Sequence, residues 1–262
     1  MNGLPLNEII HGDCLEVMRQ FPDKSIDMIL CDLPYGTTAC EWDTVIPFEP
    51  LWEQYERIIK DNGVIILFAS QPFTSKLVMS NIKLFKYELI WIKSKASDFI
   101  NANYRPMKKH ENIVVFSKGK ASPGCKNPMI YNPQGLIHKQ QIKIRKGSLG
   151  IARDRNSQQG EYMSKGKNYP TSLLEFSNEG KTFHPTQKPV ALCEYLIKTY
   201  SNEGDLVLDN CIGSGTTAIA CINTNRNYIG FELNKEYYEI AKNRINKHII
   251  DNNLQGKYSL IT

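Results

Sequence analysis

Several patterns that would assign a function directly are missing from this chain of 262 residues. Its seven cysteines form no C-x-x-C pair, and no H-E-x-x-H segment occurs, so neither a disulfide framework nor zinc-ligand spacing is indicated and we expect no metal. No G-x-x-x-x-G-K-[ST] run is present, which argues against a nucleoside triphosphatase. No Pro-Cys dipeptide is present, which argues against cytosine-C5 chemistry through an activated cysteine. We expect most cysteines to be small buried side chains.

Long apolar runs are also missing. No segment is apolar enough to span a bilayer, and the N-terminus MNGLPLNEIIHGD lacks the charged start and apolar block of a signal peptide. We therefore expect a cytoplasmic protein that does not bind a membrane. With 41% hydrophobic residues, the chain can bury the core of one large domain, or of one domain with an insertion.

Positive charge is concentrated in one part of the chain. Residues 118–181 hold 12 Lys and Arg against 4 acids, a balance of +8, whereas the remainder holds 20 basic and 23 acidic residues, a balance of −3. A local excess of this kind indicates a surface that meets phosphates. A solvated basic loop is the simpler alternative, but tyrosines and isoleucines interleaved with the charges argue against disorder.

Short strand-like runs alternate with helix-patterned segments, which predicts an α/β fold with a mostly parallel sheet. The expected strands lie near 8–11, 26–31, 64–69, 87–93, 113–116, 206–208 and 228–231. The expected helices cover 14–20, 48–60, 71–80, 189–200, 214–223 and 234–248. No good helix separates the strands at 87 and 113, so these two could form an antiparallel edge pair.

Residues 117–183 break this alternation and are rich in Gly, Pro, Asn, Ser and Gln. A structureless loop of that length is unusual inside a compact domain. We therefore expect an inserted region at 117–183 in a domain formed by residues 1–116 and 184–262.

A glycine-rich turn follows the expected strand at 206–208. Gly213 and Gly215 allow a tight turn and close approach of a ligand, and Thr216 and Thr217 open a helix whose free N–H groups favour a polar or anionic group. Glu232 ends the next strand, where an acid can accept hydrogen bonds from both hydroxyls of a ribose. The pattern predicts a nucleoside-cofactor site.

The same turn, with Ala218, also fits the loose dinucleotide fingerprint G-x-G-x-x-A, so a nicotinamide-dependent oxidoreductase is one alternative. A dinucleotide domain normally builds further strands after its fingerprint, and only one expected strand follows here. The missing strands must therefore come from the N-terminal half of the chain.

Three further segments complete the pattern. The segment Asp32-Leu33-Pro34-Tyr35 follows a strand-forming run, and it precedes the cofactor-type motif Asp209-x-x-x-Gly213-Ser214-Gly215-Thr216 in the chain. HGDC at 11–14 and HPTQKP at 184–189 also fit. In this order the set resembles the amino-group DNA methyltransferases that use S-adenosylmethionine, and specifically their β group.

The resemblance implies a seven-stranded, Rossmann-like methyltransferase sheet that is circularly permuted, with residues 117–183 as the target-recognition region. It implies that Asp13 and Cys14 bind the cofactor adenine, that Glu232 binds the ribose, and that Lys188 with the turn at 213–217 binds the methionine end. The whole expected cofactor site is Asp13, Cys14, Asp32, Lys188, Asp209, Asn210, Cys211, Gly213, Ser214, Gly215, Thr216, Thr217 and Glu232.

The tetrapeptide 32–35 suits chemistry at an exocyclic amine, whose lone pair is delocalised into the base. Asp32 and a carbonyl of Leu33 or Pro34 can hold the amine hydrogens, and the fixed φ of Pro34 helps to present those carbonyls. Tyr35 can stack on a base extruded from the duplex. We expect direct transfer to double-stranded DNA, with Lys143, Arg145, Lys146, Arg153 and Arg155 as candidate DNA contacts.

Two departures from the family motifs stand out: Leu33 replaces a proline, and Asn210-Cys211 replaces Pro-Phe. Because an acid at the first tetrapeptide position tends to accompany adenine, Asp32 favours adenine N6 over cytosine N4. Methyl transfer to RNA or a protein amide, and a DNA-binding module without catalysis, are further alternatives. The sequence leaves open the recognised DNA sequence, a homodimer and a cognate restriction endonuclease.

Overall fold

The computed structural model describes residues 3–37, 43–145, 160–178 and 187–261. The chain divides into two compact units, the first formed by Met1–Asn132 with Ser172–Thr262 and the second by Pro133–Thr171. The second unit is narrower than the expected insert at 117–183, because residues 117–132 and 172–178 belong to the first unit.

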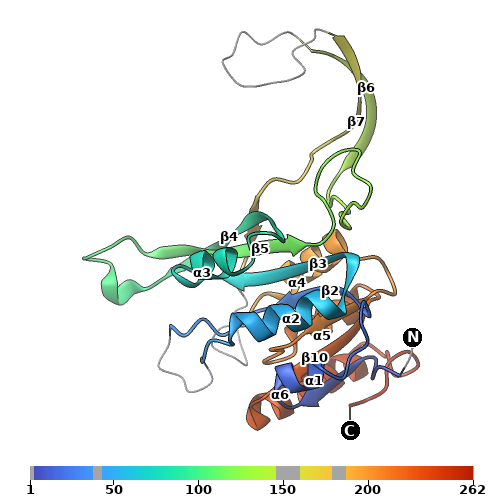
Figure 1. The fold of residues 1–262 in the computed structure, drawn as a ribbon. Coiled ribbons are helices and arrows are strands. Elements are labelled where there is room, and N and C mark those ends of the chain that lie inside the picture. Colours follow the sequence, from blue (N-terminus) through green and yellow to red (C-terminus); the bar gives the residue numbers. More distant parts are fainter. Residues whose placement is uncertain (1–2, 38–42, 146–159, 179–186, 262) are drawn as a thin grey trace. The chain divides into compact units, whose positions relative to one another are not determined.

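The first unit alternates strands and helices along most of its length (Figure 1). Its strands are β1 (Glu8–His11), β2 (Ile26–Cys31), β3 (Ile59–Ala69), β4 (Phe85–Ser97), β5 (Lys108–Ser117), β8 (Leu173–Phe176), β9 (Leu206–Asp209) and β10 (Asn227–Glu232). Its helices are α1 (Cys14–Met18), α2 (Phe48–Ile58), α3 (Phe73–Ser80), the short 3-10 helix η1 (Phe99–Asn101), α4 (Val190–Tyr200), α5 (Thr216–Asn223) and α6 (Lys235–Asp251). In the described ranges, no helix has the length and apolar character needed to cross a membrane.

One sheet holds all eight strands of the first unit, in the order β1-β10-β9-β2-β3-β5-β4-β8. The seven predicted strands are present, and β8, which falls within the predicted insert, adds an eighth. Strands β1, β10, β9, β2 and β3 are mutually parallel, and β5 runs antiparallel to both β3 and β4. The expected antiparallel pair is therefore present, but β4 is not an edge strand, because β8 pairs with it.

The order of the strands confirms the permuted fold. Strands β9 and β10 come last in the chain, yet they lie in the sheet between β1 and β2. Because neighbouring parallel strands all end at the same edge of a sheet, the loops after β1, β10, β9 and β2 meet at one edge. These loops carry the motifs at 13–14, 232, 209–217 and 32–35.

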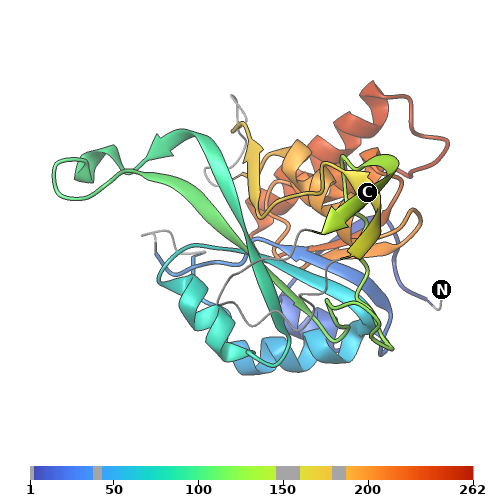
Figure 2. The ribbon, with the colours of Figure 1, turned by 90° about the horizontal axis from the view of Figure 1, so that it is seen from above.

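Alternation along the strands divides the core between the two faces of the sheet. In β3, Val64, Ile66 and Phe68 pack in the cluster that includes α4, α5 and α6, whereas Ile65 and Leu67 pack with α1, α2 and α3. Figure 2 shows the blue to teal helices on one side of the sheet and the orange to red helices on the other. Burial on both faces fixes the strand register and hence the positions of the loops at the carboxyl edge.

The second unit contains a two-stranded antiparallel ribbon. Strand β6 (Ile137–Arg145) pairs with β7 (Gly160–Lys167), so that Lys143 lies opposite Tyr162 and Arg145 opposite Gly160. The basic excess of the sequence therefore falls partly on a paired ribbon.

Candidate active site

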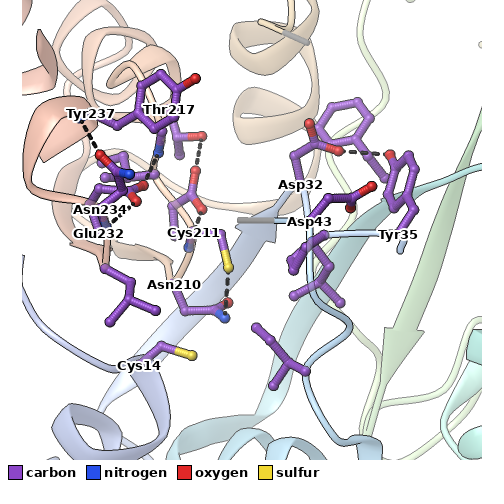
Figure 3. Close-up of a pocket in the computed structure, with 18 of the residues that line it drawn as sticks. Cys14, Asp32, Tyr35, Asp43, Asn210, Cys211, Thr217, Glu232, Asn234 and Tyr237 are labelled. Carbon is purple, nitrogen blue, oxygen red and sulfur yellow. Dashed lines mark hydrogen bonds between the residues drawn. The ribbon is translucent and has the colours of Figure 1, made fainter. Parts of the chain in front are cut away.

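A cavity of about 590 Å³ lies at the carboxyl edge of the parallel strands, within the usual size range of small-molecule sites. It brings together residues from distant parts of the chain. Of the residues expected from the sequence, the cavity is lined by Asp13, Cys14, Asp32, Leu33, Pro34, Tyr35, Lys188, Asp209, Asn210, Cys211, Gly213, Ser214, Thr216, Thr217 and Glu232. Figure 3 shows Glu232 and Thr217 on one side of the pocket and Asp32 and Tyr35 on the other.

Asp209 fixes the glycine-rich turn between β9 and α5. Its Oδ1 accepts a hydrogen bond from the backbone N–H of Cys211 at 3.1 Å, and its Oδ2 accepts one from the Thr217 hydroxyl at 2.6 Å. Burial raises the pKa of the Asp209 carboxyl to about 6. The side chain thus joins both ends of the turn, which leaves the backbone between them at the cavity surface.

Gly215 is the one predicted turn residue that does not line the cavity. It precedes α5 with φ of 83°, and an added Cβ would lie 3.1 Å from the Ile245 side chain on α6. Glycine is required here by the left-handed backbone and by close packing of the turn against α6. This is a structural reason for the residue, distinct from the expected cofactor contact.

Two carboxylates that the sequence predicts to bind a nucleoside, Asp13 and Glu232, line the cavity. The Glu232 Oε2 and Oε1 atoms accept hydrogen bonds from the backbone N–H groups of Gly213 and Asn234, both at 2.9 Å. Asp13 caps α1, since its Oδ1 accepts from the N–H groups of Leu15 and Glu16 at 2.8 and 3.3 Å. A carboxylate oxygen can accept two hydrogen bonds, so both side chains keep capacity for ligand hydroxyl or amino groups.

Arg244 on α6 supports the turn and was not predicted. Its Nη1 donates to the backbone oxygen of Ser214 at 3.0 Å and to the Thr216 hydroxyl at 2.9 Å. The sequence held no signal for this contact, because a basic residue on an amphipathic helix is usually only a solvated side chain.

The tetrapeptide after β2 forms a stiff corner. The Tyr35 hydroxyl donates to Asp32 Oδ1 at 2.7 Å, and the Tyr35 ring stacks on Phe73 with centroids 5.2 Å apart. Burial, with the nearby charge of Asp32, raises the pKa of Tyr35 well above its ordinary value, so the phenol stays a donor. Asp32 is thereby oriented from within its own motif.

Asp43 holds the next two residues and was also missed. Its two carboxylate oxygens accept hydrogen bonds from the backbone N–H groups of Gly36 and Thr37, each at 2.8 Å. Asp43 lies eight residues after the predicted motif, in a stretch with no helix or strand pattern. Only these backbone contacts reveal that it closes the corner that begins at Asp32.

Lys188 lies beside Asp32 at the centre of a buried charge network. It forms ion pairs with Asp32 Oδ2 and, at 3.4 Å, with Glu111 Oε2, and Glu111 also pairs with Lys93. Burial alone would lower the pKa of Lys188, but the charges of Asp32 and Glu111 outweigh it and raise the pKa. The Lys188 ammonium thus contacts the tetrapeptide. Its expected contact with the methionine end of a cofactor stays a prediction.

Comparison with known proteins identifies the family. A family model for DNA methylases of the N6/N4 type matches residues 26–243, which is most of the chain. The chain belongs to this DNA methylase family. Among curated relatives, the type II methyltransferase M.HpaI of Haemophilus parainfluenzae is 30% identical over 90% of this chain and 73% of its own length. The DNA adenine methyltransferase YhdJ of Escherichia coli is 26% identical over 93% of this chain and 84% of its own length.

Solved structures of DNA methylases share the fold. The M1.HpyAVI complex with S-adenosylmethionine has a TM-score of 0.61 and 26% identity, and the match covers 91% of this chain and 98% of that one. The cytosine-N4-specific PvuII DNA methyltransferase has a TM-score of 0.61 and 18% identity, over 89% of this chain and 84% of its own. The family model confirms the family expected from the sequence, and the similar structures confirm the fold.

Leu33 and Asn210-Cys211, which differ from the DNA methylase motifs, are held by contacts within this protein. Leu33 is buried in the core on the α1–α2–α3 side of the sheet, so an apolar side chain anchors the tetrapeptide in place of a proline ring. Asn210 accepts a hydrogen bond from the buried Tyr55 hydroxyl, and its amide donates to Cys211 Sγ at 3.6 Å. Burial also raises the pKa of the Cys31 thiol, next to Cys211, to about 12, so this thiol stays neutral.

Most of the described cysteines are buried, four of the six. Among described residues, no group of three or more His, Cys, Asp or Glu could hold a metal ion.

Of the candidate DNA contacts, Lys143 and Arg145 lie on β6, whereas Lys146, Arg153 and Arg155 lie outside the described residues. Their contact with DNA stays a prediction.

Proposed function

We propose that this DNA methylase transfers a methyl group from S-adenosylmethionine to N6 of an adenine extruded from duplex DNA. The observation that supports it best is the single cavity lined by both Asp32 and Gly213, which belong to motifs 181 positions apart in the chain. A methyl group can pass between two ligands only if they share one site. Family membership supports DNA as the substrate.

The residues on the β9–β10 side fit S-adenosylmethionine. Glu232 and Asp13 would accept hydrogen bonds from the ribose and the adenine amine, and the backbone at Gly213 would face the amino-acid end. Burial raises the pKa of Glu232, while the N–H groups of Asn234 and Gly213 oppose that rise by stabilising its charge. The neighbouring side chains of Cys14, Ile212 and Tyr237 supply apolar surface for a purine ring.

Bound S-adenosylmethionine supplies a methyl group on a sulfonium, which needs no metal or covalent intermediate to become reactive. The task of the protein is therefore to position the acceptor. Asp32 would accept a hydrogen bond from the target amine and turn its lone pair toward the methyl group. Lys188 forms an ion pair with Asp32, which holds the Asp32 carboxylate in place as an acceptor.

Leu33 and Pro34 would add a second acceptor through a backbone carbonyl, and Tyr35 would contact the face of the base. The stack on Phe73 and the hydrogen bond to Asp32 hold the Tyr35 ring without any ligand. A ring that is already positioned loses little conformational freedom when a base arrives.

Adenine N6 is our choice of target because the first tetrapeptide residue is an acid. Cytosine N4 is the second candidate, and the similar fold of a cytosine-N4-specific enzyme supports keeping it. Incubation of the protein with methyl-labelled S-adenosylmethionine and duplex DNA, followed by digestion to nucleosides, separates the two. We expect N6-methyladenine. Recovery of N4-methylcytosine alone would overturn the choice of base but leave the methyltransferase assignment intact.

A further inference from the structure

Strands β4 and β5 continue past the end of the sheet. Ala69, the last residue of β3, pairs with Asn112 of β5, and Asn112 pairs with Ile90 of β4. Strand β4 then runs on to Ser97 and β5 begins at Lys108, whereas β8 accompanies β4 only as far as Lys93. We call residues 94–110 the arm. Ser97 lies seven residues beyond Ile90, or roughly 20 Å at the rise of a strand, and both views show the green arm projecting (Figures 1 and 2).

The arm leaves the sheet at the edge that holds the active site. Because β5 is antiparallel to both β3 and β4, β4 points in the same direction as β3 and β2. The base of the arm is also tied to the site, since Lys93 pairs with Glu111 and Glu111 pairs with Lys188. A duplex bound along the arm would therefore lie at the same edge of the sheet as a base held at Asp32.

The tip of the arm presents large apolar side chains to solvent. Phe99, Ile100 and Tyr104 are 78%, 92% and 89% exposed. Exposed apolar groups gathered on one short segment mark a binding surface rather than part of the core.

The backbone that carries these side chains is ordered by its own contacts. Asp98 accepts a hydrogen bond from Asn101 Nδ2 at 2.6 Å and pairs with Arg105 at 2.6 Å, and the short helix η1 begins directly after it. The hydrogen bond from Asn101, with the charge of Arg105, lowers the pKa of Asp98. The apolar side chains are therefore held outward at a defined place.

The charge of the arm is positive. Residues 94–110 contain four basic residues, Lys95, Arg105, Lys108 and Lys109, and one acid, Asp98. This positive balance suits a phosphate backbone. It disfavours contact with the same arm of a second copy, because like charges would then lie close together.

We propose that the arm is a DNA-binding element of its own, which enters the duplex beside the target base and fills the stacking space that the extruded base vacates. A two-stranded β-ribbon fits the major groove, which is about 12 Å wide. Apolar side chains can insert between base steps, and an aromatic ring can replace the lost stacking. The inference rests on the proposed function and assigns to the arm a role separate from the 117–183 region.

The test compares a tip variant on two DNA duplexes. Sequencing of DNA from cells that express the protein first gives the recognised sequence. One duplex then carries the target base in its normal pair, and the other carries it opposite an abasic position, where it is already unpaired. For Phe99→Ala/Ile100→Ala/Tyr104→Ala, we expect methyl transfer to fall by about 10-fold or more on the paired duplex, and by less than about 3-fold on the unpaired one.

The control changes two apolar side chains that are exposed elsewhere. Met79 and Ile82 are 71% and 59% exposed near the end of α3, so Met79→Ala/Ile82→Ala should match the wild type on both duplexes. The tip variant should keep the melting temperature and the S-adenosylmethionine affinity of the wild type, because its three side chains are exposed and lie outside the cavity lining.

Three results would overturn the inference while leaving the proposed function in place. They are a tip variant with wild-type rates on both duplexes, one with equal losses on both, and a wild-type dimer that the tip variant converts to a monomer in sedimentation. If the wild type transfers no methyl group to any duplex, the proposed function fails and the inference about the arm fails with it.

Discussion

Replacement of Glu111 by Gln would remove the negative charge that Lys93 and Lys188 share. The side chains of Glu111 and Lys188 are 11% and 7% exposed, and that of Lys93 is 14% exposed. Gln has nearly the same shape, so the change leaves the packing intact and isolates the charge. Two ammonium groups would then remain in a buried site, with Asp32 still paired to Lys188.

The distance between Glu111 Oε2 and Lys188 Nζ is 3.4 Å. At an effective dielectric constant of about 20, two unit charges at that distance interact by about 5 kcal/mol. Breaking a buried ion pair by removal of one partner costs about 3–5 kcal/mol in other proteins. Because Asp32 still pairs with Lys188, we expect the lower end of that range for Glu111→Gln, a loss of about 3 kcal/mol in the free energy of unfolding.

Urea unfolding monitored by circular dichroism measures this loss directly. The matched control is Glu175→Gln on β8, where the side chain is exposed and the change should stay within about 0.5 kcal/mol. In Glu111→Gln/Lys93→Met one uncompensated ammonium is also removed, so the double variant should regain part of the stability. A loss below about 1 kcal/mol for the single variant, or strictly additive losses in the double variant, would refute the account of the network.

Two further predictions concern the glycine-rich turn. Since burial raises the folded-state pKa of Asp209 to about 6 from 3.8, the folded state binds the extra proton, and this stability is present at low pH and lost as pH rises from about 4 to 6. Urea unfolding should therefore show that the free energy of unfolding of the wild type, relative to that of Asp209→Asn, falls across this pH range. A difference between the two proteins that does not change with pH would contradict the burial effect. Gly215→Ala should lose more than about 1 kcal/mol because of its φ of 83° and its contact with Ile245. Gly256→Ala, with open space around it, should lose little, and equal losses at the two glycines would refute the packing argument.

The sheet was predictable because its strands are short apolar runs with clear boundaries. The permuted order followed from the position of the glycine-rich turn late in the chain, with one strand after it. Strand β8 was missed because its four residues, LLEF, lie inside a polar region and pair with residues that come 83 positions earlier in the chain. A run this short carries too little periodicity to be identified before its partner is known.

The site was predictable where a residue belongs to a motif and unpredictable where it acts through a distant contact. Asp32 and Glu232 follow strands directly, so their positions come from the sheet itself. Glu111 lies on a strand among basic residues, and Tyr55 lies on an amphipathic helix, so nothing in their local sequence indicates that they touch Lys188 and Asn210. Local patterns record the secondary structure, whereas these contacts depend on the packing of the whole sheet.

The full length of β4 and β5 was likewise not predictable from local sequence patterns. The sequence predicted strands at 87–93 and 113–116, whereas the structure has them at Phe85–Ser97 and Lys108–Ser117. The residues added within the arm, 94–97 and 108–110, are polar or basic except for Ala96, and nearly all of them are exposed to water. A pattern of buried positions could not detect strands that bury so little.

The proposed methyl transfer depends on Asp32 holding the target amine in the cavity that also holds the methyl donor. Single-turnover methyl transfer by Asp32→Ala, measured with labelled S-adenosylmethionine and duplex DNA, tests this directly when it is combined with calorimetric titration of the methyl donor. We expect the rate to fall by a factor of about 100 or more, while the protein stays folded and still binds S-adenosylmethionine. Methyl transfer at the wild-type rate by this variant would contradict the central claim.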